Sequence, residues 1–299
     1  MCFFVERTGL RNFFSLVLII LFSQHVHAGD VDWNRWSLHN PDSKDEVQYG
    51  PYDTILRTLV DDSSGIPMIR YSVLSPLEPM KYVTRYAEYL ESIPVSKLNR
   101  DEQFAYWINL HNLGVIQLYA TESGTSRNVK EARGTPGAPG EQWSKKIFEV
   151  EGQLLSLEDI EQNILLAQWH DPHTLYGLCY GVKGSPPIGT HAFTGSKVHE
   201  QLASIGKDFV NTPGNVNVKK NGLEVSSLYT WNKYLLFNDE DAQVIRHIQS
   251  LAKPTLANKM SGKTTILRDR FSWRSLATNP RTLSTGSSLG ARGGGTTGS

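Results

Sequence analysis

Apolar residues recur every three or four positions in several stretches of the chain, and this spacing is typical of an α-helix with one buried face. The clearest stripe is formed by Met80, Val83, Ala87 and Leu90. Pro94 follows closely, and we expect the helix to end just before it because proline cannot continue the helical hydrogen bonds. Further helices are predicted over residues 52–62, 196–211, 227–237 and 240–252.

Another helix start is marked by a capping side chain. Ser156 is followed by the acidic residue Asp159 three positions later. Such a pair can satisfy the free backbone N–H groups of a first helical turn. A helix is therefore predicted from this point through Ile160, Ile164 and Leu165.

Short strands are predicted between the helices. Asn221-Gly222 separates the alternating stretches 216–218 and 223–225, which is typical of a β-hairpin. Other strands are predicted over 147–150 paired with 153–155, over 68–74 and over 175–182. Because the strands are dispersed among helices of unequal length, the predicted fold class is α+β, a single mixed helix–strand domain with dispersed short strands.

One predicted helix, over residues 101–116, is apolar nearly all round. Its broad core face consists of Phe104, Trp107, His111, Val115 and, one turn further on, Leu118. On the opposite side, Glu102, Asn109 and Asn112 lie within about 80° of each other. Burying an amide without a partner costs about 1–3 kcal/mol. These three polar side chains therefore either form a hydrogen-bonded structural network or line a ligand or catalytic pocket.

The N-terminal residues have the pattern of a cleavable signal peptide. Arg7 and Arg11 precede an apolar run over 13–22, and the small residue Ala28 stands at a plausible cleavage site. The apolar run is about ten residues long, whereas a helix that spans a membrane needs about 20. We therefore expect residues 1–28 to be removed, the protein to be secreted or periplasmic, and the mature chain to have no membrane span.

Composition divides the rest of the chain into an arm, a domain and a tail. Residues 29–49 are polar but contain Trp33 and Trp36, so this arm is expected to pack on the domain, which is predicted to span 50–277. Residues 278–299 are rich in Gly, Ser and Thr, a composition typical of disordered segments.

Charge and motif content exclude several classes of function. The chain has 30 Lys and Arg residues against 30 Asp and Glu residues, so no general attraction to phosphate backbones and no nucleic-acid partner are expected. Cys2 leaves with the signal peptide and Cys179 remains alone, so no intramolecular disulfide is expected. His170 and His173 lack a third ligand in sequence, and no dinucleotide or phosphate-binding motif is present. We therefore predict neither a metal nor a cofactor.

A series of short motifs resembles one known family. The run Tyr106-Trp107-Ile108-Asn109-Leu110-His111-Asn112 is similar to the tryptophan–asparagine–tyrosine–asparagine signature of the family called domain of unknown function 547. Other landmarks resemble that family in the same order: Leu155–Glu161, Asp171-Pro172, Ser185-Pro186-Pro187, Glu224–Trp231 and Phe271-Ser272-Trp273. The resemblance extends over about residues 50–277 and implies an exported domain of undefined activity.

The chain departs from the family pattern at positions that could perform chemistry. A family segment that carries a His and two Cys is matched here by Leu175, Tyr180 and Ser185, with Cys179 one position away. His111 likewise stands where the family usually has Tyr.

Two classes of function remain open at this point. The first is a non-catalytic binding or scaffold domain that holds a small molecule, a peptide or a glycan, and the loss of the family's His and Cys favours it. Its candidate binding residues are Tyr106, Asn109, His111 and Asn112.

The alternative is a hydrolase- or transferase-like enzyme with a pocket between the Asn109/Asn112 helix and the Ser185–His191 loop. Its candidate catalytic residues are Glu102, Ser185 and His191. The amides would orient or polarise a substrate, and His191 or Glu102 would move protons. Ser185 would need an adjacent base to become a nucleophile.

Overall fold

The structure, a computed structural model, describes residues 31–63, 65–70, 73–74, 77–121, 133–135 and 138–276. The predicted signal peptide (1–28) and the predicted tail (278–299) lie outside the described residues. The elements below belong to one compact unit that begins at Trp33. Among the described residues, no helix combines the length and the apolar character needed to cross a membrane.

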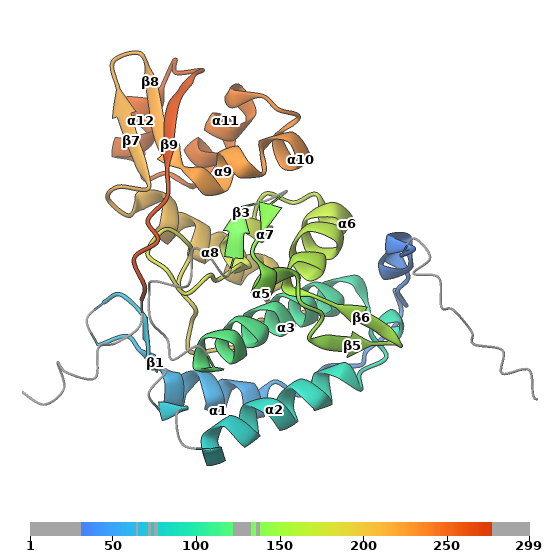
Figure 1. Cartoon of the computed structure of the whole chain (residues 1–299). Coiled ribbons are helices and arrows are strands. Elements are labelled where there is room, and N and C mark those ends of the chain that lie inside the picture. The colour runs from blue at the N-terminus through green and yellow to red at the C-terminus, as the bar shows by residue number, and fades with distance from the viewer. Residues whose placement is uncertain are drawn as a thin grey trace, which may run out of the picture. The chain divides into compact units, whose positions relative to one another are not determined.

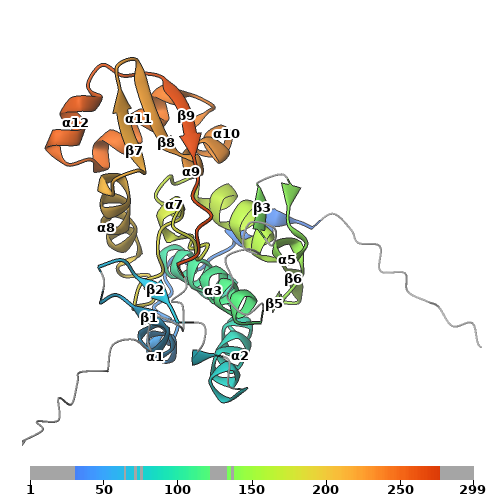
Figure 2. The same cartoon turned by 60° about the vertical axis from the view of Figure 1, so that its left-hand side comes forward.

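Helix α3 (Arg100–Thr121) runs through the middle of this unit (Figure 1). Helices α1 (Gly50–Leu59) and α2 (Leu77–Glu91) lie along one side of α3, and α7 (Thr174–Gly177) and α8 (Val198–Asn211) lie on the other side, as both views show (Figures 1 and 2). Every residue from 102 to 116 is buried. A helix that is apolar nearly all round is expected to be enclosed in this way.

The helices signalled by local patterns are confirmed. In α2, Val83, Ala87 and Leu90 are buried, as the stripe predicts. Ser156 and Asp159 form the predicted reciprocal cap, because Ser156 Oγ accepts from the Asp159 N–H at 3.1 Å and Asp159 Oδ2 accepts from the Ser156 N–H at 2.7 Å. The helix that follows, η4 (Asp159–Leu166), was predicted, but it is a π-helix and not an α-helix.

Several further helices surround this framework. They are the 3₁₀-helices η1 (Trp33–Ser37) and η3 (Val95–Lys97), the π-helix η4 (Asp159–Leu166), and the α-helices α5 (Glu141–Ser144), α6 (Ala167–Trp169), α9 (Ser227–Trp231), α10 (Lys233–Phe237), α11 (Asp241–Leu251) and α12 (Pro254–Met260). In η1, Trp36 is buried and lies edge-on against Trp107, with ring centroids 5.0 Å apart, so this part of the arm packs on α3.

The strands form small separate sheets, and the α+β class is confirmed. The hairpins are β1 (Val60–Asp61) with β2 (Met68–Ile69), β3 (Gly134–Thr135) with β4 (Ala138–Pro139), β5 (Phe148–Val150) with β6 (Gln153–Leu155), and β7 (Val216–Lys219) with β8 (Gly222–Ser226). Strand β9 (Ile266–Arg270) adds to β8 in parallel. The hairpins around Gly152 and Gly222 match the predicted ones, whereas β9 was not predicted.

The predicted strand over 175–182 is wrong. Its first residues belong to helix α7, residues 178–181 have no regular structure, and Val182 forms an isolated bridge with Ser275. Side chains satisfy the backbone here instead of a sheet: Asn112 bonds the Gly177 carbonyl, and Ser185 Oγ accepts from the Tyr180 N–H. The segment is apolar because it lies in the core.

Other boundaries also differ from the prediction. The helix predicted over 52–62 is α1, which ends at Leu59, and Val60–Asp61 belong to β1. The stretch 227–237 is two short helices, α9 and α10, which meet at Asn232, a residue whose side chain bonds the Leu228 carbonyl. The strand predicted over 68–74 is reduced to β2, with residues 71–72 outside the described part.

Candidate functional site

The polar side chains of α3 hold a segment that crosses it, residues 192–197. The Asn109 amide donates to the Phe193 carbonyl at 2.8 Å and accepts from the Phe193 N–H at 3.0 Å. Glu102 Oε2 accepts from the Gly195 N–H at 2.9 Å, and its Oε1 accepts from the Val47 N–H at 2.9 Å. The face of α3 that carries Glu102 and Asn109 is therefore covered by the chain's own backbone.

Two neighbouring elements complete the attachment of the 192–197 segment. Asp53 on α1 accepts from the Ala192 N–H at 2.7 Å. Gln201 on α8 donates to the Ala192 carbonyl at 2.8 Å and accepts from the Thr194 N–H at 3.1 Å. Gly195 must be glycine for the segment to lie this close, because a Cβ there would be 2.4 Å from Glu102 Oε2.

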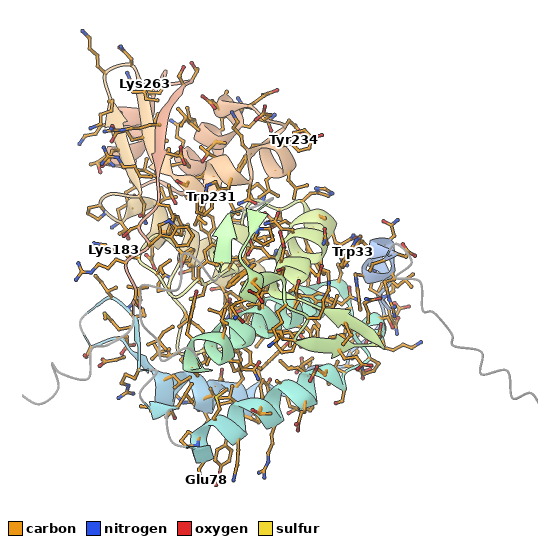
Figure 3. The ribbon with its side chains drawn as sticks, in the orientation of Figure 1. Trp33, Glu78, Lys183, Trp231, Tyr234 and Lys263 are labelled. Carbon is orange, nitrogen blue, oxygen red and sulfur yellow. The ribbon has the colours of Figure 1, made fainter. Side chains whose placement is uncertain are left out.

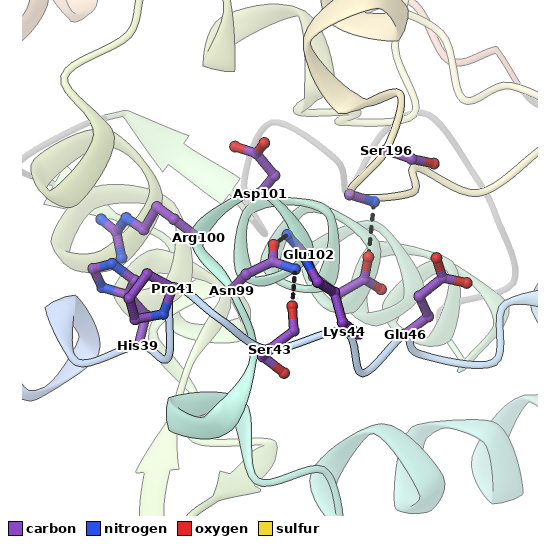
Figure 4. Close-up of a pocket in the computed structure, with 11 residues that line it drawn as sticks. His39, Pro41, Ser43, Lys44, Glu46, Asn99, Arg100, Asp101, Glu102 and Ser196 are labelled. Carbon is purple, nitrogen blue, oxygen red and sulfur yellow. Dashed lines mark hydrogen bonds between the residues drawn. The ribbon is translucent and has the colours of Figure 1, made fainter.

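A first cavity, of about 500 Å³, borders this segment at the start of α3 (Figure 4). Its cationic Arg100 already donates to the Trp36 and Gln168 carbonyls and lies over the Trp169 ring at 3.6 Å. The lining residues are His39, Pro41, Ser43, Lys44, Glu46, Asn99, Arg100, Asp101, Glu102, Gly195 and Ser196. The buried Glu102 and the partly buried Arg100 of this cavity thus serve the fold.

A second cavity, of about 350 Å³, borders the same segment at Phe193 and Lys197. Its wall includes Asn112 and the loop that the sequence placed opposite the asparagines. The lining residues are Asn112, Tyr176, Gly177, Pro187, Ile188, Gly189, His191, Phe193, Lys197, Glu200, Gln201, Ser204 and Ile205. Of the candidate residues, the structure brings Asn112 and His191 to this cavity and Glu102 to the first one.

Asn112 is bonded to backbone in the same manner as Asn109. Its amide donates to the Gly177 carbonyl at 2.8 Å and accepts from the Cys179 N–H at 3.1 Å. Cys179 is buried, its sulfur accepts from the Gly181 N–H, and burial raises the pKa of the thiol to about 11. At neutral pH the sulfur is therefore protonated and enclosed, unlike a nucleophilic thiolate.

Ser185 and His191 are not assembled as a nucleophile and base. Ser185 is 3% exposed; its Oγ accepts from the Tyr180 N–H at 3.0 Å and donates to the Val182 carbonyl at 3.0 Å. His191 is exposed, with Nδ1 3.1 Å from Thr190 Oγ1. Among the described residues, no hydrogen bond connects Ser185 to a histidine.

Tyr106 and His111 lie in the core, away from both cavities. The Tyr106 hydroxyl donates to the Leu90 carbonyl at 2.9 Å. His111 Nε2 lies 3.6 Å from Glu161 Oε2, and both side chains are fully buried. These two candidates therefore belong to the interior of the domain.

Sequence reasoning missed a buried charge cluster around Glu161. Arg133 Nη2 and the Tyr180 hydroxyl donate to Glu161 Oε1 at 2.8 and 3.0 Å. The Arg133 guanidinium also lies over the rings of Tyr180 and Trp231, 3.9 and 5.1 Å from their centroids. Burial raises the pKa of the Glu161 carboxyl, but Arg133, His111 and Tyr180 outweigh it and hold this pKa at about 2. The cluster is a buried ion pair inside an aromatic box.

The residues of α8 and its N-cap that line the second cavity were also missed. Lys197, Glu200, Gln201 and Ser204 follow each other at helical spacing and line the cavity together. That spacing was readable in the sequence, but nothing local indicated which residues this face of the helix would contact.

His173 forms a pair with Asp171, 2.8 Å apart, and within the described ranges no cluster of His, Cys, Asp and Glu could hold a metal.

The central part of the domain matches a known family model. Residues 95–210, from η3 to α8, match the family model described as a protein of unknown function, DUF547. No match was found among curated proteins or among solved structures. The motifs Glu224–Trp231 and Phe271-Ser272-Trp273, which resemble the same family, lie outside the matched residues.

Proposed function

Since residues 95–210 make this chain a member of the DUF547 family, we propose that it is an exported, non-catalytic binding domain whose second cavity holds a small ligand. The observation that carries the proposal is the bonding of the polar candidates. Asn109, Asn112 and Ser185 all bond the backbone. They thereby support a preformed cavity, whereas a catalytic group needs free reach to a substrate.

The lining of the second cavity suggests the kind of ligand. Tyr176, Ile188 and Phe193 supply an apolar floor, and a volume of about 350 Å³ suits a small molecule. The Tyr176 hydroxyl is 2.8 Å from His247 Nε2, which fixes the ring. At the edge, Lys197 and Glu200 make no side-chain hydrogen bond or ion pair with any described residue. We propose a ligand with an apolar body and a charged or zwitterionic end.

Three probes that share one aromatic body test this proposal: phenylalanine, phenylacetate and phenethylamine. We expect phenylalanine to bind best, because its carboxylate can meet Lys197 and its ammonium Glu200. Binding should shift the backbone amide signals of Gly189 and Gln201 in a two-dimensional NMR titration. Ser204→Trp, at the cavity, should abolish these shifts.

Ser250→Trp, at an exposed position on α11, is the matched control and should leave the shifts unchanged. Binding that survives Ser204→Trp, or no shift with any of the three probes, would contradict the ligand proposal. Labelling of the native protein by serine- or cysteine-directed probes above a heat-denatured control would contradict the non-catalytic part.

Export rests on the basic and apolar pattern before Ala28. We expect a chain expressed with its own N-terminus in a secretion-competent bacterium to be recovered outside the cytoplasm, beginning at Gly29. N-terminal sequencing of the recovered protein measures this. Recovery of an intact N-terminus in the cytoplasmic fraction would contradict export without affecting the cavity.

A further inference from the structure

The sheet β7–β8–β9 has an outer face whose long cationic side chains reach solvent. Side chains alternate along a strand, and the residues of the opposite face, among them Val216, Leu223 and Val225, are buried. Glu224 lies in the middle of this outer face, with Arg268 as its neighbour on β9. The same alternation puts Lys219, Glu224, Arg268 and Arg270 on this outer face.

The outer face carries an excess of positive charge. Glu224 contacts Arg268 directly and lies 3.6 Å from Lys219 Nζ and 3.8 Å from Arg270 Nη2. These three cationic side chains are 48–58% exposed, whereas the Glu224 side chain is 9% exposed. One mostly covered carboxylate therefore faces three cations that remain accessible to solvent.

Two lysines extend this positive area at the end of the sheet. Lys220 stands in the turn between β7 and β8, and Lys263 Nζ donates to the Lys220 carbonyl at 2.7 Å. Figure 3 shows Lys263 at this end of the sheet. Because the whole chain has equal numbers of basic and acidic residues, the excess is a local property of this surface.

An apolar side chain is exposed within the positive area. Leu267 is 47% exposed and lies over Gly222, where a Cβ would come within 3.0 Å of Leu267 Cγ. Gly222 faces the same side as Glu224, two positions along the strand, so Leu267 lies on the outer face. The outer face thus combines cationic side chains with one exposed leucine.

We propose that the outer face of the β7–β8–β9 sheet docks onto a membrane surface that contains anionic lipid. Charge complementarity carries the inference, since each Lys or Arg near such a surface strengthens binding by a factor of roughly five. Leu267, which is exposed among these cations, can enter the interface between headgroups and acyl chains. The docking is peripheral and independent of the ligand cavity.

The test is sedimentation of the purified protein with vesicles of phosphatidylcholine containing phosphatidylglycerol, against vesicles of phosphatidylcholine alone. We expect binding only to the anionic vesicles, weakened by added salt. Replacing Lys220, Arg268 and Arg270 by glutamine should lower the partition coefficient roughly a hundredfold, because three charges are lost. The matched control replaces Lys97, Lys145 and Lys207 by glutamine. These lysines are exposed outside the sheet, so this variant should keep most of the binding.

A variant that is expected to increase vesicle binding distinguishes a loss of docking from structural damage. Glu224→Gln removes the one acid of the face, so vesicle binding should increase about fivefold even though the contacts with Arg268 are weakened. Unchanged or reduced binding by Glu224→Gln would contradict the proposal. Equal binding to both kinds of vesicle would also overturn it, as would binding of soluble dextran sulfate without any binding to vesicles.

Discussion

Replacing Arg133 by methionine is expected to lower the free energy of unfolding by about 3–5 kcal/mol, the usual effect of breaking a buried ion pair. Methionine fills much of the space of the arginine but leaves Glu161, which is 1% exposed, without its cation. Urea denaturation of the purified protein measures the loss. Arg57→Met, at a half-exposed surface pair, should cost less than about 1 kcal/mol.

The pH dependence of Arg133→Met provides a second measurement of the same effect. In the parent protein the pKa of Glu161 is about 2, below its unfolded value, so this group contributes stability above about pH 4.5 that is lost as the pH falls towards 2. Without Arg133, burial dominates and the folded pKa exceeds the unfolded one. Acidification from neutral pH to about 4.5 should then stabilise the variant relative to the parent.

The double variant Arg133→Met/Glu161→Gln discriminates between a lost ion pair and lost packing. Because both charges are absent, it should recover much of the stability of the parent and lose the relative stabilisation by acid. A double variant no more stable than Arg133→Met alone would show that the packing of the arginine over Tyr180 and Trp231 dominates.

Replacing Asn109 by leucine should destabilise the protein by about 2–6 kcal/mol. Leucine is similar in size but leaves the buried N–H and carbonyl of Phe193 without partners, and each unsatisfied group costs about 1–3 kcal/mol. Urea denaturation gives the total. Hydrogen exchange gives the location, because the amides of Phe193 and Gly195 should exchange faster.

Asn258→Leu, at an exposed position on α12, is the control and should change stability by less than about 0.5 kcal/mol. If Asn109→Leu left exchange in the 192–197 segment unchanged, the amide of Asn109 would not be what holds this segment on α3.

Local sequence signals predicted the local structure. The stripe of α2, the Ser156–Asp159 cap and the Asn221-Gly222 turn each depend on residues within a few positions of one another. The strand predicted from Leu175 was wrong because a short apolar run is compatible both with a strand and with an irregular core segment. The pairing of β8 with β9 depends on residues about 40 positions apart, and no local pattern in the polar β9 marks it.

For the candidate site, the sequence likewise predicted which residues need partners but not which partners they find. The position of Glu102, Asn109 and Asn112 on a buried helix required that they find partners, which they do. The identity of those partners was not readable, because Phe193 is 84 positions from Asn109 and Gly195 is 93 positions from Glu102. Arg133 stands in a Gly- and Pro-rich stretch, where nothing in the sequence indicated burial beside Glu161.

The attachment of the 192–197 segment also bears on the order in which the chain folds. Its bonds to Asp53, Glu102 and Asn109 close loops of 139, 93 and 84 residues. Contacts that close long loops carry a large entropic penalty before other contacts compensate for it, so they form late. The segment borders both cavities. Both cavities are therefore features of the completed native state, and partly folded chains would lack them.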